Sequence, residues 1–581
     1  MRHTKIFVGV GLLLLLAATA WGSDTDGVTQ ETSFWIGGHL IDTSDYYKKV
    51  GEYRSFEEDV WPEFGLTYKS TTPNSRFFFK GHYFDRDEMF GMISTKVSDI
   101  FTGKFRYNSF QRQTGQDLLE NIEAREWLPS VPKGGGKILT HDITDPDADY
   151  NYNRKEILSE FSALLSRENN LRLTVAHRAI IKEGTEQLIS NSHCFSCHLE
   201  SKSAKVEDRT HDFQAGLDTK AGNLDVGYKF GYRHYESTTP TPMAYYEDAK
   251  HPVKGTSGAE FGSRLNYDGS SMPIDAKPKI EKTSHKARIK GAAGKGQFAS
   301  SFALSKATNK LTDLSAKSWA GVFNYAVPIS PKTRLVAKAS ATSITADDPY
   351  IDVNTFREGK PSAVDFDYIR YSVLDRTTAD FTAQIFHRLN PKTTLSFLAG
   401  YNRVAREDYP VAGDGTTSST IIGQAKVRYR QGMKLTTSFK YRFEKTSDPF
   451  VSGKGLFEVP GDALEPVHYG YDAATGDSLW GYFYYMREDL WYQAITTEPT
   501  DYHEVNLSST FRPSAKTTLN LKVKGVIDKN GDLDSLDVKH SKLNGNLSFT
   551  FMPDLKWVLS GGVSYRMEKS RGPVAVALFD G

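Results

Sequence analysis

The chain has 581 residues, with 72 basic and 71 acidic side chains, two cysteines and a mean hydropathy of −0.48. The near-zero net charge argues against a dedicated nucleic-acid binder, which needs a basic surplus for phosphate contacts, so we expect no nucleic-acid partner. Beyond the N-terminus no apolar run of about 20 residues occurs, which excludes a helical membrane protein. A transmembrane β-barrel stays open, because its strands are only half apolar.

The N-terminus predicts export. Basic residues at Arg2, His3 and Lys5 precede the apolar run from Ile6 to Ala18, and small residues follow. A single anchoring helix fits less well, because the run is short for a membrane span. We predict that residues 1–22 are a cleaved signal peptide and that residues 23–581 form the mature protein.

The body of the chain alternates polar and apolar residues with a period of two. Between Val505 and Phe511, and again between Leu435 and Phe443, every second residue is mostly apolar and the residues between are polar. This pattern predicts strands with one apolar and one polar face. A soluble β-sandwich or propeller is the alternative.

The connections between these strands favour a membrane barrel. Short turns, such as those at 72–74, 168–170, 390–392 and 513–515, are separated by two strands that a longer loop joins. Outer-membrane barrels have short periplasmic turns and long extracellular loops. We therefore predict an all-β, transmembrane antiparallel β-barrel of about 22 strands in lipid of the outer membrane of a Gram-negative bacterium. Its first strand is expected to begin near Ser33 and its last near Pro573.

A barrel of this size has a wide lumen that needs a plug or a passenger. The polar faces of the expected strands would line it. Candidate contacts to a partner, or simply hydrated lumen residues, are Lys434, Lys440, Arg442, Glu504, Lys522 and Lys524.

Both cysteines lie in one motif, His193-Cys194-Phe195-Ser196-Cys197-His198. Cys-x-x-Cys-His is the attachment signature of c-type haem, in which two thiols form thioethers and the histidine binds iron. We predict one covalent haem c on Cys194 and Cys197, with His198 as the proximal iron ligand. A disulfide is the main alternative, since a zinc site lacks a second thiol pair and a thioredoxin motif lacks its βαβ setting.

The sixth iron ligand is harder to assign. His193 is too close to the attachment site, while His177 and His234 fall on the apolar face of their strands. His211 is the local candidate for the distal position. The haem-bearing loop is expected at about 182–209, on the long-loop side of the barrel.

Two further segments carry weaker signals. The long outer loop at about 446–500 is rich in aromatic and acidic residues, which suit either a docking surface or packing over the barrel mouth. Asp528, Asn530, Asp532 and Asp534 offer oxygen ligands for calcium, but they match the EF-hand pattern only in part.

With these features, the chain resembles the porin component of outer-membrane porin-cytochrome electron conduits, the decahaem-associated β-barrel family. The segments Lys49 to Tyr53 and Gly81 to Asp87 look like the first strands of that family. The likeness is diffuse, and the familiar porin of the group carries no haem of its own. The resemblance therefore implies a haem-bearing variant.

The resemblance also implies the function. The protein would hold a periplasmic or extracellular multihaem c-type cytochrome and support extracellular electron transfer, without being an enzyme. The alternatives are a solute-permeable porin with a sensory or structural haem, and a periplasmic haem protein.

Overall fold

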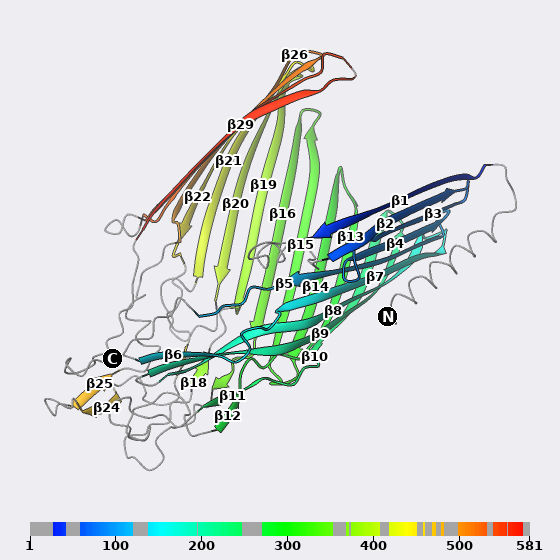
Figure 1. Ribbon diagram of the computed structural model, residues 1–581. Coiled ribbons are helices and arrows are strands. Elements are labelled where there is room, and N and C mark those ends of the chain that lie inside the picture. The colour runs from blue at the N-terminus through cyan, green and yellow to red at the C-terminus, as the bar shows by residue number, and fades with distance from the viewer. Residues whose placement is uncertain are drawn as a thin grey trace.

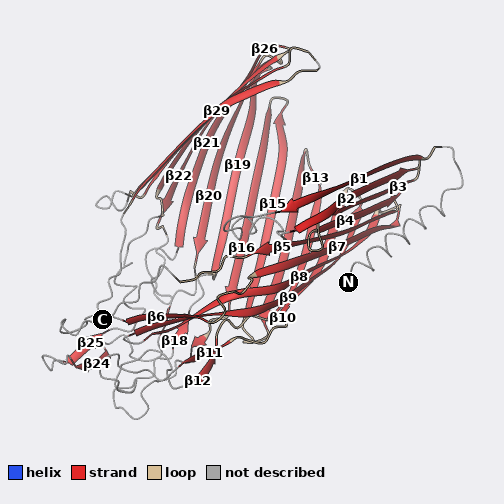
Figure 2. Cartoon of the chain, in the orientation of Figure 1, coloured by secondary structure: helices blue, strands red, loops and turns tan. Residues whose placement is uncertain are grey.

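The computed structural model describes residues 27–41, 59–119, 138–193, 196–246, 270–351, 368–370, 374–406, 417–449, 457–458, 467–471, 478–481, 498–531, 538–554 and 556–572. The regular elements of these residues are strands (Figures 1 and 2). Among them, no helix has the length and apolar character that a membrane crossing needs. The signal peptide expected at 1–22 lies outside the described residues.

One sheet of 22 strands dominates the described part of the chain. Its strands are β1 (Thr29–Ile41), β2 (Asp59–Thr71), β3 (Ser75–Tyr83), β4 (Met89–Val97), β5 (Phe101–Gln113), β6 (Ile138–Ile143), β7 (Asn151–Ser166), β8 (Leu171–His193), β9 (Ser196–Ala221), β10 (Leu224–Ser237), β13 (Ile280–Ala293), β14 (Gly296–Asn309), β15 (Ser315–Ser330), β16 (Thr333–Ala346), β19 (Arg376–Asn390), β20 (Thr393–Ala405), β21 (Thr417–Gln431), β22 (Leu435–Ser447), β26 (Asp501–Ser514), β27 (Thr517–Lys529), β28 (Lys539–Phe551) and β29 (Leu559–Arg571). Smaller sheets in the connections are made by β11 (Met243–Tyr246) with β12 (Ser270–Pro273), by β17 (Tyr350–Ile351), β18 (Tyr368–Arg370) and β23 (Phe457–Glu458), and by β24 (Val467–Tyr471) with β25 (Ser478–Gly481).

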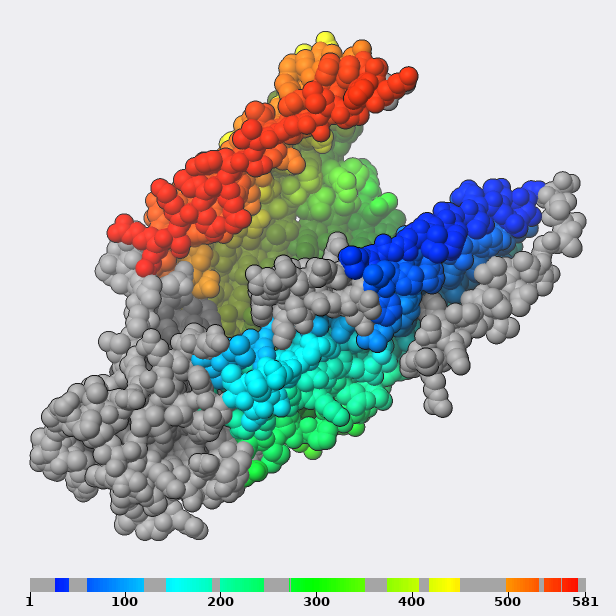
Figure 3. Space-filling view, viewed as in Figure 1, coloured from blue at the N-terminus to red at the C-terminus, as the bar shows by residue number. Residues whose placement is uncertain are grey.

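The large sheet is an antiparallel meander in which each strand pairs with the next one along the chain. The one exception in the described residues is β6, which pairs in parallel with β9. Figure 3 shows the curled sheet with its first strands (blue) and last strands (red) as its two edges. The expected all-β antiparallel architecture is confirmed at this level.

Short and long connections alternate along the meander, as the sequence predicts. Tight turns join β2 to β3, β7 to β8, β19 to β20 and β26 to β27, and longer connections leave the opposite end of the sheet. The turn between β13 and β14, at 294–295, is one that the sequence pattern did not locate. β29 ends at the long-loop end of the sheet, and the last strand expected near Pro573 lies outside the described residues.

The two faces of the sheet differ in chemistry. Large apolar side chains project from one face, and register alignment puts Phe302, Phe323, Phe381 and Tyr401 there, each with more than a third of its surface exposed. The opposite face carries charged and polar side chains, some of them buried, such as Glu156 and Glu504. A water-soluble sheet protein has the reverse pattern, with the apolar face buried.

The hairpin of β8 and β9 extends well beyond its neighbour β10. Residues 182–209, expected as a loop, instead continue the two strands, with β8 running to His193 and β9 starting at Ser196. Both faces of this part are polar in sequence, so period-two alternation gives no sign of a strand there. Pairing along the whole length of the hairpin maintains it instead.

A connecting segment holds this extended hairpin. Residues 114–119 and 144–150, which we call the strap, lie on either side of β6 in the β5–β7 connection. The side-chain amide of Gln187 in β8 accepts a hydrogen bond from the backbone N–H of Asp117 at 2.8 Å and donates one to the backbone carbonyl of Asp117 at 2.7 Å. The N–H and hydroxyl of Thr144 both donate to the carbonyl of Ser201 in β9. The opposite face of the extended hairpin contacts the β10–β13 connection, in which Lys277 forms an ion pair with Glu186 of β8 at 2.8 Å.

Candidate binding site on the polar face

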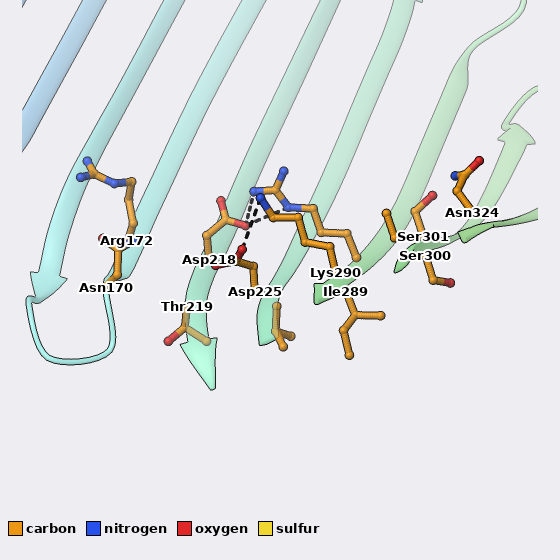
Figure 4. Close-up of a pocket in the computed structure, with 13 residues that line it drawn as sticks. Asn170, Arg172, Asp218, Thr219, Asp225, Ile289, Lys290, Ser300, Ser301 and Asn324 are labelled. Atoms are coloured by element: carbon orange, nitrogen blue, oxygen red, sulfur yellow. Dashed lines mark hydrogen bonds and ion pairs between the residues drawn. The ribbon is translucent and has the colours of Figure 1, made fainter. Parts of the chain in front are cut away.

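A cavity of about 470 Å³ lies on the polar face near the short-turn ends of β8, β9, β10, β13, β14 and β15. Figure 4 shows the side chains that line it on these neighbouring strands, with charged groups meeting near Asp218, Asp225 and Lys290. Its charged lining residues are Arg172, Asp218, Asp225, Arg288 and Lys290. Alternate residues of consecutive strands share a face, so the register of the sheet brings these side chains together.

Two ion pairs run across the strands of the cavity. Arg288 of β13 reaches over β10 to Asp218 of β9 at 2.7 Å, and Lys290 of β13 meets Asp225 of β10 at 3.3 Å. Gly227 lies beneath the first pair. A Cβ atom there would stand 2.2 Å from Asp218 Oδ1 and 2.6 Å from Arg288 Nε, so the long-range pair requires glycine at this position.

Two lysines occupy opposite positions two residues along the strands from Gly227 and Arg288, in the direction away from the short-turn end. Lys229 of β10 and Lys286 of β13 are direct cross-strand partners. Both are exposed, and the structure gives neither an acidic partner among the described residues. The Lys229 side chain lies against Gly216 of β9. Like charges on directly opposite residues destabilise a sheet, so an anion bound near the two lysines would relieve the repulsion between them.

A second charged group lies on β22, β26 and β27. Glu504, which is 6% exposed, pairs with Lys440 and, at 3.2 Å, with Lys524. Arg442 pairs with Glu444 on its own strand. Lys522 faces Ser508 and Asn546 across the strands, and Lys434 lies at the tight turn before β22. Of the six predicted lumen residues, the structure thus joins Lys440, Glu504 and Lys524.

The haem motif falls at the tip of the β8–β9 hairpin. Cys194 lies outside the described residues, and of Cys197 and His198 only the backbone is described. Cys197 pairs with His193 and His198 with Ser192, at the long-loop end of the sheet. The haem attachment therefore stays a prediction.

His211 is not brought close to the motif. It lies 13 positions beyond His198 on the continuous strand β9, which corresponds to roughly 40 Å. Its Nδ1 is 3.2 Å from Nε2 of His177, and the two rings stack with centroids 5.5 Å apart. This histidine pair lies on the apolar face, beside Phe213.

The candidate calcium residues are only partly described. Asp528 contacts His540 at 3.3 Å, and the side-chain amide of Asn530 donates to the carbonyl of Glu498 at 2.9 Å. Asp532 and Asp534 lie outside the described residues. In the part of the chain that the structure describes, no group of three or more His, Cys, Asp or Glu residues is arranged to hold a metal ion.

No protein-family model matches the chain, and no curated protein matches it either. Among solved structures, the chain is similar to the FrpB iron transporter from Neisseria meningitidis, with 10% identity over 92% of this chain and 75% of that one and a TM-score of 0.42. It is also similar to the copper transporter OprC, with 9% identity, coverage of 93% and 74% and a TM-score of 0.45. It is similar as well to the alcaligin receptor FauA from Bordetella pertussis, with 10% identity over 88% of this chain and 73% of that one and a TM-score of 0.40. Identities this low concern the fold alone.

These findings correct the predicted family. The similar structures are transporters and receptors, so the expectation of a porin component of a porin-cytochrome conduit, with a multihaem cytochrome as partner and electron transfer as function, is wrong. The two alternatives, a porin with a sensory haem and a periplasmic haem protein, are set aside with it. Alternating strands and asymmetric connections follow from membrane crossing itself, so they do not distinguish large barrels of different function.

The sequence reasoning missed the charged cavity. A signal is present in β13, where Lys282, Lys286, Arg288 and Lys290 fall at even positions and Ala287 and Ile289 at odd ones. The partners Asp218 and Asp225 come from other strands, and only the register of the sheet pairs them with β13.

Proposed function

We propose that the protein is an outer-membrane transporter or receptor for anionic solutes, exported by its N-terminal signal and built as a closed transmembrane barrel. The observation that carries this proposal is the pair of opposed lysines, Lys229 and Lys286, on the polar face of a sheet whose other face is exposed and apolar.

Three features support the barrel. The exposed apolar face suits hydrocarbon, in which every strand edge must be paired, and closure achieves this. Burial of Glu156, Ser396 and Glu504 on the polar face fits a sheet that curls with this face inward. Barrels of about 22 strands belong to the size class of outer-membrane transporters, whereas porins have 16 to 18.

The choice of an anionic solute rests on local charge balance. Around the cavity Arg288 and Lys290 are offset by aspartates, while Lys229 and Lys286 have no such partner among the described residues. An anion between them would replace repulsion with two charge-assisted hydrogen bonds. Carboxylate and phosphate groups fit this requirement.

The test is equilibrium binding of citrate to the detergent-solubilised protein at low ionic strength, with glucose as the neutral comparison. We expect citrate to bind, with an affinity that falls as the salt concentration rises. In the variant Lys229→Gln/Lys286→Gln the affinity for citrate is expected to fall about tenfold or more. The control Lys338→Gln/Lys522→Gln removes the same charge from polar-face lysines that stand opposite uncharged residues. Equal losses in the two variants, or equal binding of glucose and citrate, would count against the proposal.

We also propose that Cys194, Cys197 and His198 attach one haem c at the tip of the β8–β9 hairpin. Support comes from the specificity of the motif, since the chain has no other cysteine. Haem staining of the denatured protein and its loss in Cys194→Ser/Cys197→Ser test the attachment. A colourless protein with a Cys194–Cys197 disulfide would establish the alternative.

A further inference from the structure

Two adjoining cavities lie on the apolar face of the sheet, on the opposite side from the charged cavity. The first, of about 440 Å³, spans β14 to β20, and the second, of about 540 Å³, spans β13 to β16. On β14, β15 and β16 the lining residues of the two cavities follow one another along the strands, so we treat them as one groove. The groove runs toward the long-loop end.

The first part of the groove is apolar. Phe302, Phe323 and Phe381 project beside a floor of small residues that includes Gly321, Ala339 and Ala341. Each of the three rings keeps 46–51% of its surface exposed. Large rings beside a floor of glycine and alanine offer an apolar surface that suits a hydrocarbon chain.

The second part of the groove is cationic. Lys306 of β14 and Lys317 of β15 both line it and are direct cross-strand partners. Both side chains are exposed, and the structure gives no ion pair for either among the described residues. Asp347 lies within range of electrostatic attraction to both lysines but forms no ion pair with either. Its carboxylate instead accepts hydrogen bonds from the backbone N–H and the hydroxyl of Ser315, each at 2.8 Å. Opposed lysines next to an apolar channel call for an anionic group attached to an apolar chain.

We propose that this groove binds a phosphate-bearing lipid of the outer leaflet, with its phosphate between Lys306 and Lys317 and one acyl chain along the apolar part. The inference rests on the proposed embedding in the outer membrane. Within that arrangement the lysines lie at the long-loop boundary of the apolar face, one row beyond Leu304 and Trp319, which is the level of lipid headgroups. Charge complementarity selects a phosphorylated lipid over a neutral one.

The experiment measures binding of lipid A to the full-length protein in a non-ionic detergent by native mass spectrometry. We expect a bound lipid A that is displaced neither by phosphatidylcholine nor by inorganic phosphate. Lys306→Gln/Lys317→Gln is expected to weaken binding about tenfold or more, because two charge-assisted contacts are removed. The control Lys539→Gln/Lys569→Gln removes two exposed lysines from β28 and β29 and is expected to leave binding unchanged.

A second variant tests the apolar part. Ala341→Phe narrows the groove without changing charge and is expected to weaken lipid A binding while citrate binding on the other face is retained. Displacement by inorganic phosphate together with normal binding in Ala341→Phe would mean a site for a free anion and would overturn the proposal. Equal binding of phosphatidylcholine, or a dimer in which the groove is covered by a second copy, would do the same. A protein that is soluble without detergent would instead refute the membrane embedding.

Discussion

At the scale of single residues, one glycine leaves room for an ion pair that lines the charged cavity. The ion pair of Asp218 and Arg288 spans β10 because Gly227 leaves room beneath it. Gly525 on β27 also lies within a strand of the same sheet, but a Cβ there would meet nothing within 4 Å. Substitution by alanine at Gly525 is therefore the matched control for the same substitution at Gly227.

We predict that Gly227→Ala lowers the free energy of unfolding by about 0.2–1 kcal/mol relative to Gly525→Ala, because the added methyl group must displace an exposed ion pair. Gly525→Ala is expected to be neutral or slightly stabilising, since alanine restricts the unfolded chain more than glycine does. Urea unfolding in detergent, followed by tryptophan fluorescence, measures both. Equal effects of the two substitutions would mean that the ion pair does not occupy the space above Gly227.

The opposed lysines give a second prediction at this scale. Lys286→Glu converts repulsion with Lys229 into attraction and is expected to stabilise the protein by about 0.2–1 kcal/mol while it abolishes citrate binding. The control is Lys338→Glu, because Lys338 stands opposite Asn324 and Thr382. Stability from urea unfolding and affinity from calorimetry should move in opposite directions for Lys286→Glu alone. Destabilisation by this variant would argue that Lys229 already has a partner.

At the scale of elements, the extended β8–β9 hairpin depends on the strap. The backbone N–H of Ser203 in β9 donates to Asp145 Oδ2 at 2.9 Å, and the Ser203 hydroxyl contacts the phenol of the buried Tyr150 at 3.2 Å. Hydrogen bonds from Ser203 hold the pKa of Asp145 below its usual value. Asp145 and Tyr150 of the strap thus fix the part of the hairpin that extends past β10.

This contact predicts a pH dependence. Because the folded-state pKa of Asp145 is depressed, its stabilising contact is fully present above the unfolded pKa of 3.8 and is lost as the pH falls through the folded value. Hydrogen exchange at the Ser203 amide, corrected for intrinsic rates, should therefore show protection that falls progressively as the pH is lowered beneath 3.8, compared with pH 7. Asp145→Asn keeps an acceptor oxygen but cannot titrate, so its protection should change little. A parallel loss of protection in Asp145→Asn would assign the pH effect to another group.

At the scale of the whole molecule, the sheet has an apolar face exposed where a soluble protein would bury it. Leu547 and Ser548 are neighbours on β28 and point to opposite faces, and Leu547 is 53% exposed. They test directly which face meets lipid.

We predict that Leu547→Arg reduces stability in phospholipid bilayers by about 2–4 kcal/mol, as expected for a cation in hydrocarbon, and that Ser548→Arg has a much smaller effect. Unfolding by guanidinium from liposomes, followed by tryptophan fluorescence, compares the two variants. Similar effects of both substitutions would contradict an apolar outer wall.

The period-two pattern identified most strands and the parity of their connections, because alternation is a local consequence of strand geometry. It failed at residues 182–209, where both faces are polar and the strands are maintained by their pairing and by the strap. It also gave no indication of β6, whose parallel pairing with β9 joins segments far apart in the chain. The family prediction failed for a different reason, since a shared architecture does not specify what a lumen binds.

The amino-acid sequence by itself determined the antiparallel β architecture, the two chemically distinct faces and the Cys-x-x-Cys-His motif, since each depends on residues that are close together in the chain. The tertiary structure decided which charges meet. Lys229 faces Lys286, and Lys306 faces Lys317, only because strand register fixes cross-strand neighbours, and a shift by one residue would send each side chain to the other face.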